Sequence, residues 1–290
     1  MHLYSLRSPI WIIKCNNLYI KNNVTRSLPL RMNMSSSNKE KSTVDEGDVQ
    51  RHSNLINDWW DPNGSIKGLH SFNYIRVPFV RDGLVSEIER DKTSTPLANK
   101  KILDIGCGGG ILSEGLARIG AIVTGVDASE DLIHLAKQHS HIDAKIARNK
   151  PTYYCNTIEK HSKEFSEHYD AVVASEIIEH VADKELFVKS CVEAVKPGGK
   201  IFITTPNRSR WTQVLGIFVA EYVLNVLPRG THQYDKFTTP NEVTMLLGRN
   251  NCQVELVKGI TYNPFNNKWA WVNSHTLCFA LQATKLNSSI

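Results

Sequence analysis

The chain has 290 residues, a length that favours one α/β domain with extensions over two large domains. Its composition is 41% hydrophobic and 22% charged, which excludes a wholly disordered, collagen-like or coiled-coil chain. The formal charge of +5 arises at the start, because residues 1–39 carry six basic and no acidic side chains, whereas the rest carries 28 basic and 29 acidic ones and lacks the basic balance of a nucleic-acid-binding protein.

The first 34 residues are basic, free of acids and rich in Ser and Asn, which is typical of a mitochondrial transit peptide. A secretory signal is one alternative, although Lys14, Asn16 and Asn17 interrupt its apolar run, and a disordered tail is another. We expect a transit peptide over 1–34, cleaved near residues 32–37. A flexible linker over 35–54 and one domain over 55–290 should follow.

The elements of this domain are predicted from hydrophobic periodicity. Residues 55–85 mix aromatic residues with turn formers, which indicates helices that cap the domain. Strand and helix patterns then alternate, so we expect an α/β fold with a doubly wound, mostly parallel, seven-stranded sheet, which is a Rossmann-like fold. The expected strands are 101–105, 121–126, 152–155, 171–174, 200–204, 253–258 and 276–284, and the main helices are 111–119, 129–139, 184–195 and 241–249.

A glycine-rich motif, DIGCGGG at residues 104–110, ends the first strand and opens a helix, where an α/β sheet binds its ligand. A dinucleotide fingerprint would need a third glycine at position 111, which is Ile111. Asp127 ends the second strand, and its carboxylate can accept hydrogen bonds from both ribose hydroxyls of an adenosine. This arrangement fits S-adenosylmethionine (SAM) at least as well as NAD. The simpler alternative is a tight turn with Asp127 as a helix cap.

The chain resembles class I SAM-dependent methyltransferases through this block and the turn KPGG at 196–199. More specifically, residues 55–284 resemble the ubiquinone-biosynthesis O-methyltransferase family. The motifs that carry this second resemblance are Asp58-Trp59-Trp60-Asp61, Leu69-His70, Asn73-Tyr74-Ile75-Arg76, Ser175-Glu176-Ile177-Ile178-Glu179-His180, Pro206-Asn207-Arg208, Gly230-Thr231-His232 and Tyr262-Asn263-Pro264.

This resemblance implies methylation of one hydroxyl of a polyprenyl catechol at two steps of ubiquinone synthesis, of the dihydroxy-polyprenylbenzoate and demethylubiquinol types. The family's SAM-contacting positions fall on Arg76, Gly106, Asp127 and Ser175, where many relatives carry Met at the last. Arg76 suits a guanidinium that pairs with the methionine carboxylate, and a surface arginine that caps a helix is the alternative. No general base is identified, although His232 is one candidate.

Glu176, Glu179 and His180 follow the strand at 171–174 and would share one face of a helical turn. Two carboxylates and an imidazole suit Mg²⁺ or a similar divalent cation. Such an ion would lower the pKa of a catechol hydroxyl, which is about 10 in a free phenol. The alternative is that Glu176 and Glu179 are first-turn acids that the helix dipole stabilises, while His180 packs or is solvated. The family resemblance, which carries a magnesium-type site at these positions, favours metal.

Residues 208–236 form an insertion with eleven large apolar residues between basic ones, which is too apolar for a solvated loop. It is either a lid over the active site or an interfacial helix. The related family is associated with membrane lipid through this region. We therefore expect a peripheral protein on the matrix face of the mitochondrial inner membrane, in a multi-protein quinone-biosynthesis complex.

Three other functions are alternatives to a catechol O-methyltransferase. A different small-molecule methyltransferase and a non-catalytic scaffold of that complex stay open, although a scaffold has no use for intact glycines, Asp127 and the Glu/Glu/His set. A nucleic-acid methyltransferase is disfavoured, because the chain lacks both a basic patch beyond residue 39 and an Asn/Asp-Pro-Pro-Tyr motif. We expect no nucleic-acid partner.

Overall fold

The computed structural model describes residues 42–45, 47, 49, 56–209 and 236–287. The chain divides into two units, Met1–Glu40 and Lys41–Ile290, and all the described residues belong to the second. The expected transit peptide, most of the expected linker and residues 210–235 of the expected insertion lie outside the described residues.

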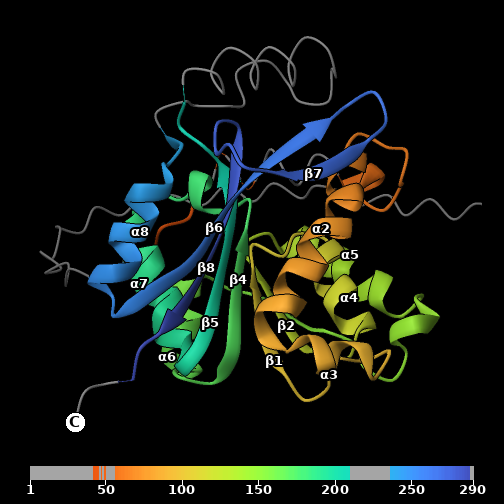
Figure 1. The fold of residues 1–290 in the computed structure, drawn as a ribbon. Coiled ribbons are helices and arrows are strands. Elements are labelled where there is room, and N and C mark those ends of the chain that lie inside the picture. The colour runs from red at the N-terminus through yellow and green to blue at the C-terminus, as the bar shows by residue number, and fades with distance from the viewer. Residues whose placement is uncertain (1–41, 46, 48, 50–55, 210–235, 288–290) are drawn as a thin grey trace, which may run out of the picture. The chain divides into compact units, whose positions relative to one another are not determined.

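An eight-stranded sheet forms the centre of the described fold, in the order β3-β2-β1-β4-β5-β8-β6-β7 (Figure 1). The first five strands pair in parallel, and the pairs β5–β8, β8–β6 and β6–β7 are antiparallel. The strands are β1 (Lys101–Ile105), β2 (Ile122–Asp127), β3 (Thr152–Cys155), β4 (Tyr169–Ser175), β5 (Val195–Pro206), β6 (Cys252–Asn263), β7 (Lys268–Val272) and β8 (Cys278–Lys285).

The predicted Rossmann-like, doubly wound sheet is confirmed, but its seven strands are corrected to eight. The added strand, β7, forms an antiparallel hairpin with the end of β6, where Tyr262 lies opposite Trp269. β6 continues past residue 258, the predicted end of its apolar run, and turns back through residues 264–267. The added strand lies at the sheet edge, where pairing with one neighbour leaves little periodic signal.

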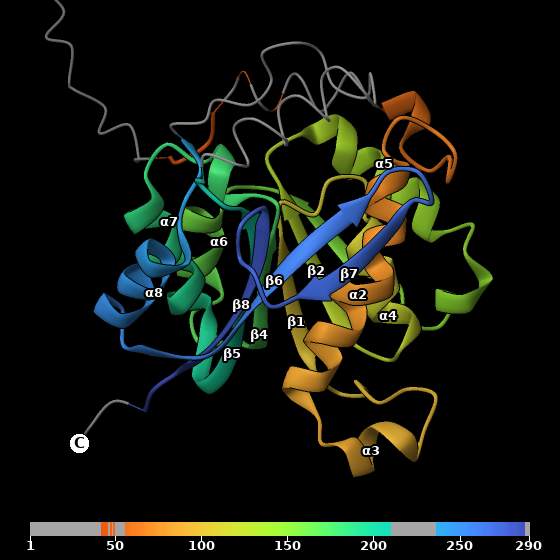
Figure 2. The same ribbon diagram turned by 45° about the horizontal axis from the view of Figure 1, so that its top comes forward.

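Helices cover both faces of the sheet (Figure 2). α2 (Lys67–Leu84), α4 (Ile111–Arg118) and α5 (Glu130–Ser140) lie on one face, and α6 (Ile158–Glu164), α7 (Lys184–Ala194) and α8 (Pro240–Arg249) on the other. The short α3 (Glu87–Asp91) and three 3₁₀ turns, η1 (Ile56–Asp58), η2 (Ala144–Ile146) and η3 (Ile178–His180), connect them. Local signals set the ends: Ser129 caps α5, and Thr239 with Glu242 forms a capping box on α8.

The core has two halves because β1 and β4 are covered on both faces. Leu103 and Val172 pack with α6, α7 and α8, whereas Ile102 and Val173 pack with α2 and α4. All four are at most 2% exposed, as expected of central parallel strands. The carboxyl ends of β1, β2 and β4 therefore lie together at one edge, where doubly wound sheets bind ligands.

The predicted helical cap is confirmed as α2, which closes the site from one side. The Phe72 and Trp269 rings stack with centroids 4.2 Å apart, and Trp269 Nε1 donates to the Gly68 carbonyl at 2.9 Å. At Gly83 a Cβ would lie 2.6 Å from the Phe202 ring, so only glycine permits this close approach of α2 to β5. Packing against β5 and β7 thus fixes where α2 presents Arg76.

Candidate active site

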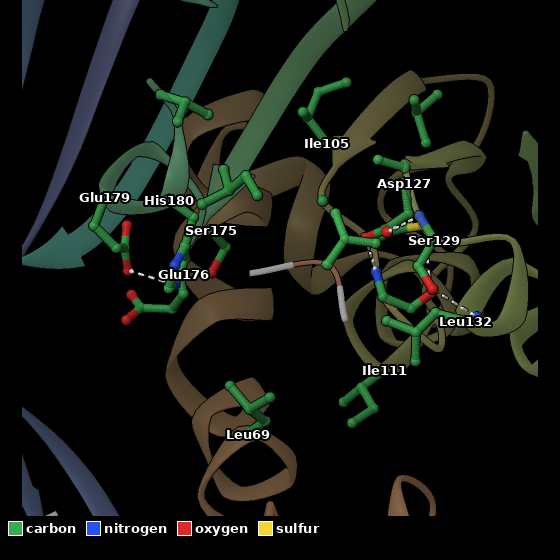
Figure 3. Close-up of a pocket in the computed structure, with 18 of the residues that line it drawn as sticks. Leu69, Ile105, Ile111, Asp127, Ser129, Leu132, Ser175, Glu176, Glu179 and His180 are labelled. Carbon is green, nitrogen blue, oxygen red and sulfur yellow. Dashed lines mark hydrogen bonds and ion pairs between the residues drawn. The ribbon is translucent and has the colours of Figure 1, made fainter. Parts of the chain in front are cut away.

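A cavity of about 380 Å³ opens at the carboxyl ends of β1, β2 and β4 (Figure 3). Asp127 and Ser129 lie on one side of it, and Glu176, Glu179 and His180 on the other. The structure brings together all the residues that the sequence singled out for the cofactor and the metal. These cavity-lining residues are Arg76, Gly106, Asp127, Ser175, Glu176, Glu179 and His180.

The glycine turn, residues 106–110, follows β1, and its first three residues line the cavity. Gly106, Gly108 and Gly110 have φ values of 68°, 52° and 91°, a left-handed conformation that side chains rarely adopt. A Cβ on Gly108 would lie 2.4 Å from the Trp59 ring. The turn therefore needs glycine both for its backbone conformation and for the packing of the cap against it.

Asp127 lies beside this turn, at the end of β2. Its Oδ2 accepts a hydrogen bond from Gly108 N–H at 2.9 Å, and its Oδ1 accepts one from Ser129 N–H at 2.8 Å. The alternative that Asp127 is a helix cap is thus correct in part, because Asp127 bonds to Ser129, the residue that caps α5. Each carboxylate oxygen has a second acceptor site, so both can also accept from a diol in the cavity.

Arg76 reaches the cavity from α2 and is buried, at 6% exposure. Its Nη1 donates to Ser175 Oγ at 3.0 Å, and its Nη2 donates to Asn73 Oδ1 at 2.7 Å and to the Leu69 carbonyl at 3.2 Å. Burial lowers the pKa of Arg76 to about 10, although the nearby carboxylates of Asp104 and Glu176 oppose the shift. The alternative of a surface arginine is excluded, and a held cation faces the cavity.

The carboxylates after β4 are arranged differently from the prediction. Glu176 has a φ of 57° and its N–H donates to the Thr204 carbonyl at 2.8 Å, so the residue continues the pairing with β5. Only Ile178–His180 form a helical turn. The prediction that all three side chains share one face of a single helical turn is therefore wrong, because strand pairing extends one residue further than the apolar run.

The two carboxylates, Glu176 and Glu179, lie close enough for the second to affect the pKa of the first. Glu179 is 4% exposed and its Oε2 accepts a hydrogen bond from Thr205 Oγ1 at 2.9 Å. Burial, and then repulsion from Glu179, raise the pKa of Glu176 to about 8. A proton or a cation placed between them would relieve this repulsion.

The described residues contain no group of three His, Cys, Asp or Glu side chains placed closely enough to hold a metal ion. Of the predicted ligands, His180 and Glu179 lie near each other, with 4.0 Å between His180 Nε2 and Glu179 Oε1 (Figure 3). The residue types fit a magnesium-type ion, but these side-chain positions do not form a ligand set.

Sequence reasoning missed several cavity residues because nothing in their local pattern marks them. Thr43 falls in the expected linker, yet it is 2% exposed and lines the cavity. Its carbonyl accepts a hydrogen bond from Ala182 N–H at 2.9 Å, and its Oγ1 donates to Glu159. Tyr262 and Trp269, the pair across the β6–β7 hairpin, also line the cavity. The candidate base His232 lies outside the described residues.

Within the described part of the chain, no helix combines the length and the apolar character needed to cross a bilayer.

Comparisons with known proteins define the class. A family model described as "Methyltransferase domain" matches residues 84–287. The fold is similar to that of the magnesium protoporphyrin IX methyltransferase of Synechocystis with bound SAM, with a TM-score of 0.53 and 18% identity over 84% of this chain and 92% of that one. It is equally similar, at 15% identity, to a Thermotoga maritima SAM-dependent methyltransferase, covering 82% of this chain and 99% of that one. The chain is a SAM-dependent methyltransferase.

Similarity to curated sequences is closer. The "Ubiquinone biosynthesis O-methyltransferase, mitochondrial" of Rattus norvegicus is 38% identical over 90% of this chain and 76% of its own length. The "Ubiquinone biosynthesis O-methyltransferase" of Rhizobium etli is 43% identical over 79% of this chain and 91% of its own length. For the human relative, 40% identical over 84% of this chain, the match spans 66% of its length. The chain belongs to the ubiquinone biosynthesis O-methyltransferase family.

Proposed function

We propose that this enzyme transfers the methyl group of SAM to one hydroxyl of a polyprenyl catechol during ubiquinone biosynthesis. One observation carries the proposal: a single cavity has Asp127 on one side, next to the glycine turn, and the half-buried Glu176 and buried Glu179 on the other (Figure 3). Family membership supports the same reaction, because the relatives are ubiquinone biosynthesis O-methyltransferases.

On the cofactor side, the Asp127 carboxylate accepts hydrogen bonds from the two ribose hydroxyls. Gly106 allows the backbone to approach the ligand closely. Arg76 pairs with the methionine carboxylate. Ser175 holds Arg76 through the hydrogen bond at 3.0 Å and, through Thr204 Oγ1 at 2.8 Å, links it to β5. A backbone contact from position 175 would survive a Met side chain there, whereas this link through the hydroxyl would not.

On the acceptor side, the catechol lies between the cofactor and the wall formed by Glu176, Glu179 and His180. These three residues would hold Mg²⁺ or a similar divalent cation once their side chains turn toward a common point. The proposal is supported by their residue types and by the repulsion between the Glu176 and Glu179 carboxylates, which a cation relieves. When bound, the cation supplies Lewis-acid activation of the catechol oxygen.

The substrates of this reaction, of the dihydroxy-polyprenylbenzoate and demethylubiquinol types, carry an apolar tail that partitions into a bilayer. We therefore also propose import through residues 1–34 and peripheral contact with the matrix face of the inner membrane through the insertion 208–236, within a multi-protein complex. Among the described residues, Phe265 at the tip of the β6–β7 hairpin is 93% exposed beside the exposed Lys268, which suits an anionic lipid surface.

The decisive experiment is a methyl-transfer assay with SAM and a short-chain catechol, with and without a chelator. Turnover on the catechol, and none on a matched phenol with one hydroxyl, is expected. SAM binding without turnover on any catechol would favour the scaffold. Turnover on unrelated acceptors at equal efficiency would favour another small-molecule methyltransferase.

A further inference from the structure

Trp60 holds the glycine turn from outside the cavity. Its Nε1 donates to the Gly109 carbonyl at 3.0 Å. Gly109 lies next to Gly108, whose N–H donates to Asp127. A hydrogen bond to this carbonyl therefore restrains the backbone that orients the expected ribose acceptor. Trp60 is not among the described residues that line the cavity.

His139, on α5, fixes the plane of the Trp60 ring. The two rings stack with centroids 3.4 Å apart and an interplanar angle of 3°. A parallel stack at this distance restrains rotation of the indole, and so restrains the direction of its N–H. His139 does not line the SAM cavity among the described residues either.

Glu114, on α4, fixes the imidazole in turn. Its side chain is fully buried, and its Oε1 lies 2.8 Å from His139 Nδ1. Its Oε2 accepts from Arg118 Nη2 at 3.1 Å. A buried carboxylate is costly unless it is paired, and as an acceptor it places the hydrogen of His139 on Nδ1. The ring is therefore held in one orientation.

We propose that Glu114, His139 and Trp60 act in series as positioning residues that keep the glycine turn in the conformation that binds SAM. None of the three contacts the cofactor in this arrangement; each acts through the Gly109 carbonyl. Losing the series lowers SAM affinity, whereas methyl transfer from the fully bound enzyme keeps its rate.

The test measures the SAM dissociation constant by calorimetry and steady-state turnover on a short-chain catechol, using the full chain. His139→Ala and Trp60→Phe are each expected to raise the Kd and the KM for SAM about five- to tenfold, the effect of one lost hydrogen bond, with kcat within about twofold of the parent. Trp60→Phe keeps an aromatic ring at this position and removes the N–H donor. It therefore serves as the test if His139→Ala does not fold.

Coupling separates this role from a merely structural one. Because His139 acts through the indole N–H, adding His139→Ala to Trp60→Phe should weaken SAM binding no further. His134→Ala is the matched control, since His134 lies on the same helix, is exposed and bonds to Gln138. Parental affinity in folded Trp60→Phe, additive losses in the double variant, or an equal loss in His134→Ala would each overturn the proposal.

Discussion

The Arg76 guanidinium on α2 is joined to the Ser175 hydroxyl at the end of β4 by a hydrogen bond of 3.0 Å. This bond ties the helical cap to the central sheet at the cavity. It also places a buried cation where the methionine carboxylate of SAM is proposed to lie. If Arg76 binds SAM as proposed, the cap contributes to cofactor binding as well as to packing.

Replacing this cation should affect the cofactor first. We expect Arg76→Lys to raise the Kd for SAM about tenfold or more, because an ammonium cannot make the parallel pair of hydrogen bonds with a carboxylate. Isothermal calorimetry on the folded variant measures this. Arg81→Lys is the control, since Arg81 lies further along α2 and forms an ion pair with the neighbouring Asp82. Parental SAM affinity in Arg76→Lys would remove Arg76 from the cofactor site.

Asp127→Ala should lose SAM affinity by about tenfold to a hundredfold, because the ribose hydroxyls lose a charged acceptor. The variant should stay folded, since Ser129 still caps α5 through its own hydroxyl. Circular dichroism checks the fold, and equilibrium dialysis with labelled SAM measures affinity. Unchanged affinity contradicts the ribose role and leaves Asp127 as a structural cap.

Chelation, or the double replacement of Glu176 and Glu179 by Ala, should reduce turnover far more than SAM binding, because the proposed cation serves the catechol. Glu185→Ala is the control, since Glu185 is exposed on α7 and pairs with Arg249. Turnover is followed by methyl transfer to a short-chain catechol, and SAM binding by calorimetry. Full activity after exhaustive chelation would make the carboxylates structural.

Asp104 predicts a pH dependence of stability. Burial raises the pKa of Asp104 from 3.8 to about 6, while Ser113 Oγ donates to it at 2.6 Å. The folded state therefore binds a proton that the unfolded chain releases between these values. This contribution to stability is complete below pH 3.8 and is lost as the pH rises through 6, a change on the order of 3 kcal/mol.

Asp104→Asn keeps the shape of the protonated acid and removes the titration. Urea unfolding at pH 4 and pH 7 should show that the variant gains stability over the parent at the higher pH. An identical difference between variant and parent at both pH values would mean that Asp104 is ionised throughout.

The membrane proposal is tested with cardiolipin-containing vesicles. Ile217→Glu combined with Phe218→Glu, within the insertion, should reduce co-sedimentation because two charges enter the apolar segment. Turnover on a soluble catechol should persist. Equal vesicle binding by parent and variant would reject membrane contact through the insertion.

The sequence predicted most of the elements that position the site, because buried parallel strands and amphipathic helices carry strong periodic signals. The predicted strand at 152–155 coincides with β3 (Thr152–Cys155), and the predicted starts of α4 and α7 are those of the structure. Pairing was harder: β7 depends on a hairpin at a sheet edge, and Glu176 joins the strand only through contact with Thr204 on β5. Local periodicity contains neither relationship.

Motifs located the cavity residues better than they described their contacts. The glycine turn, Asp127 and Arg76 were found from spacing and resemblance, and all line the cavity. The bond between Arg76 and Ser175 spans 99 positions, and the stack of Trp60 on His139 joins the turn after η1 to α5. Such contacts are set by tertiary packing, which a single sequence does not display.

The burial of Thr43 bears on how the protein can be shortened. A chain begun at residue 55, the expected start of the domain, would lose this wall of the cavity and leave Glu159 without its hydroxyl donor. Proteolytic maturation near residues 32–37 would retain it. Recombinant versions should therefore start before residue 42. A protease that cuts just after Thr43 would open this wall of the cavity while leaving every strand of the sheet intact.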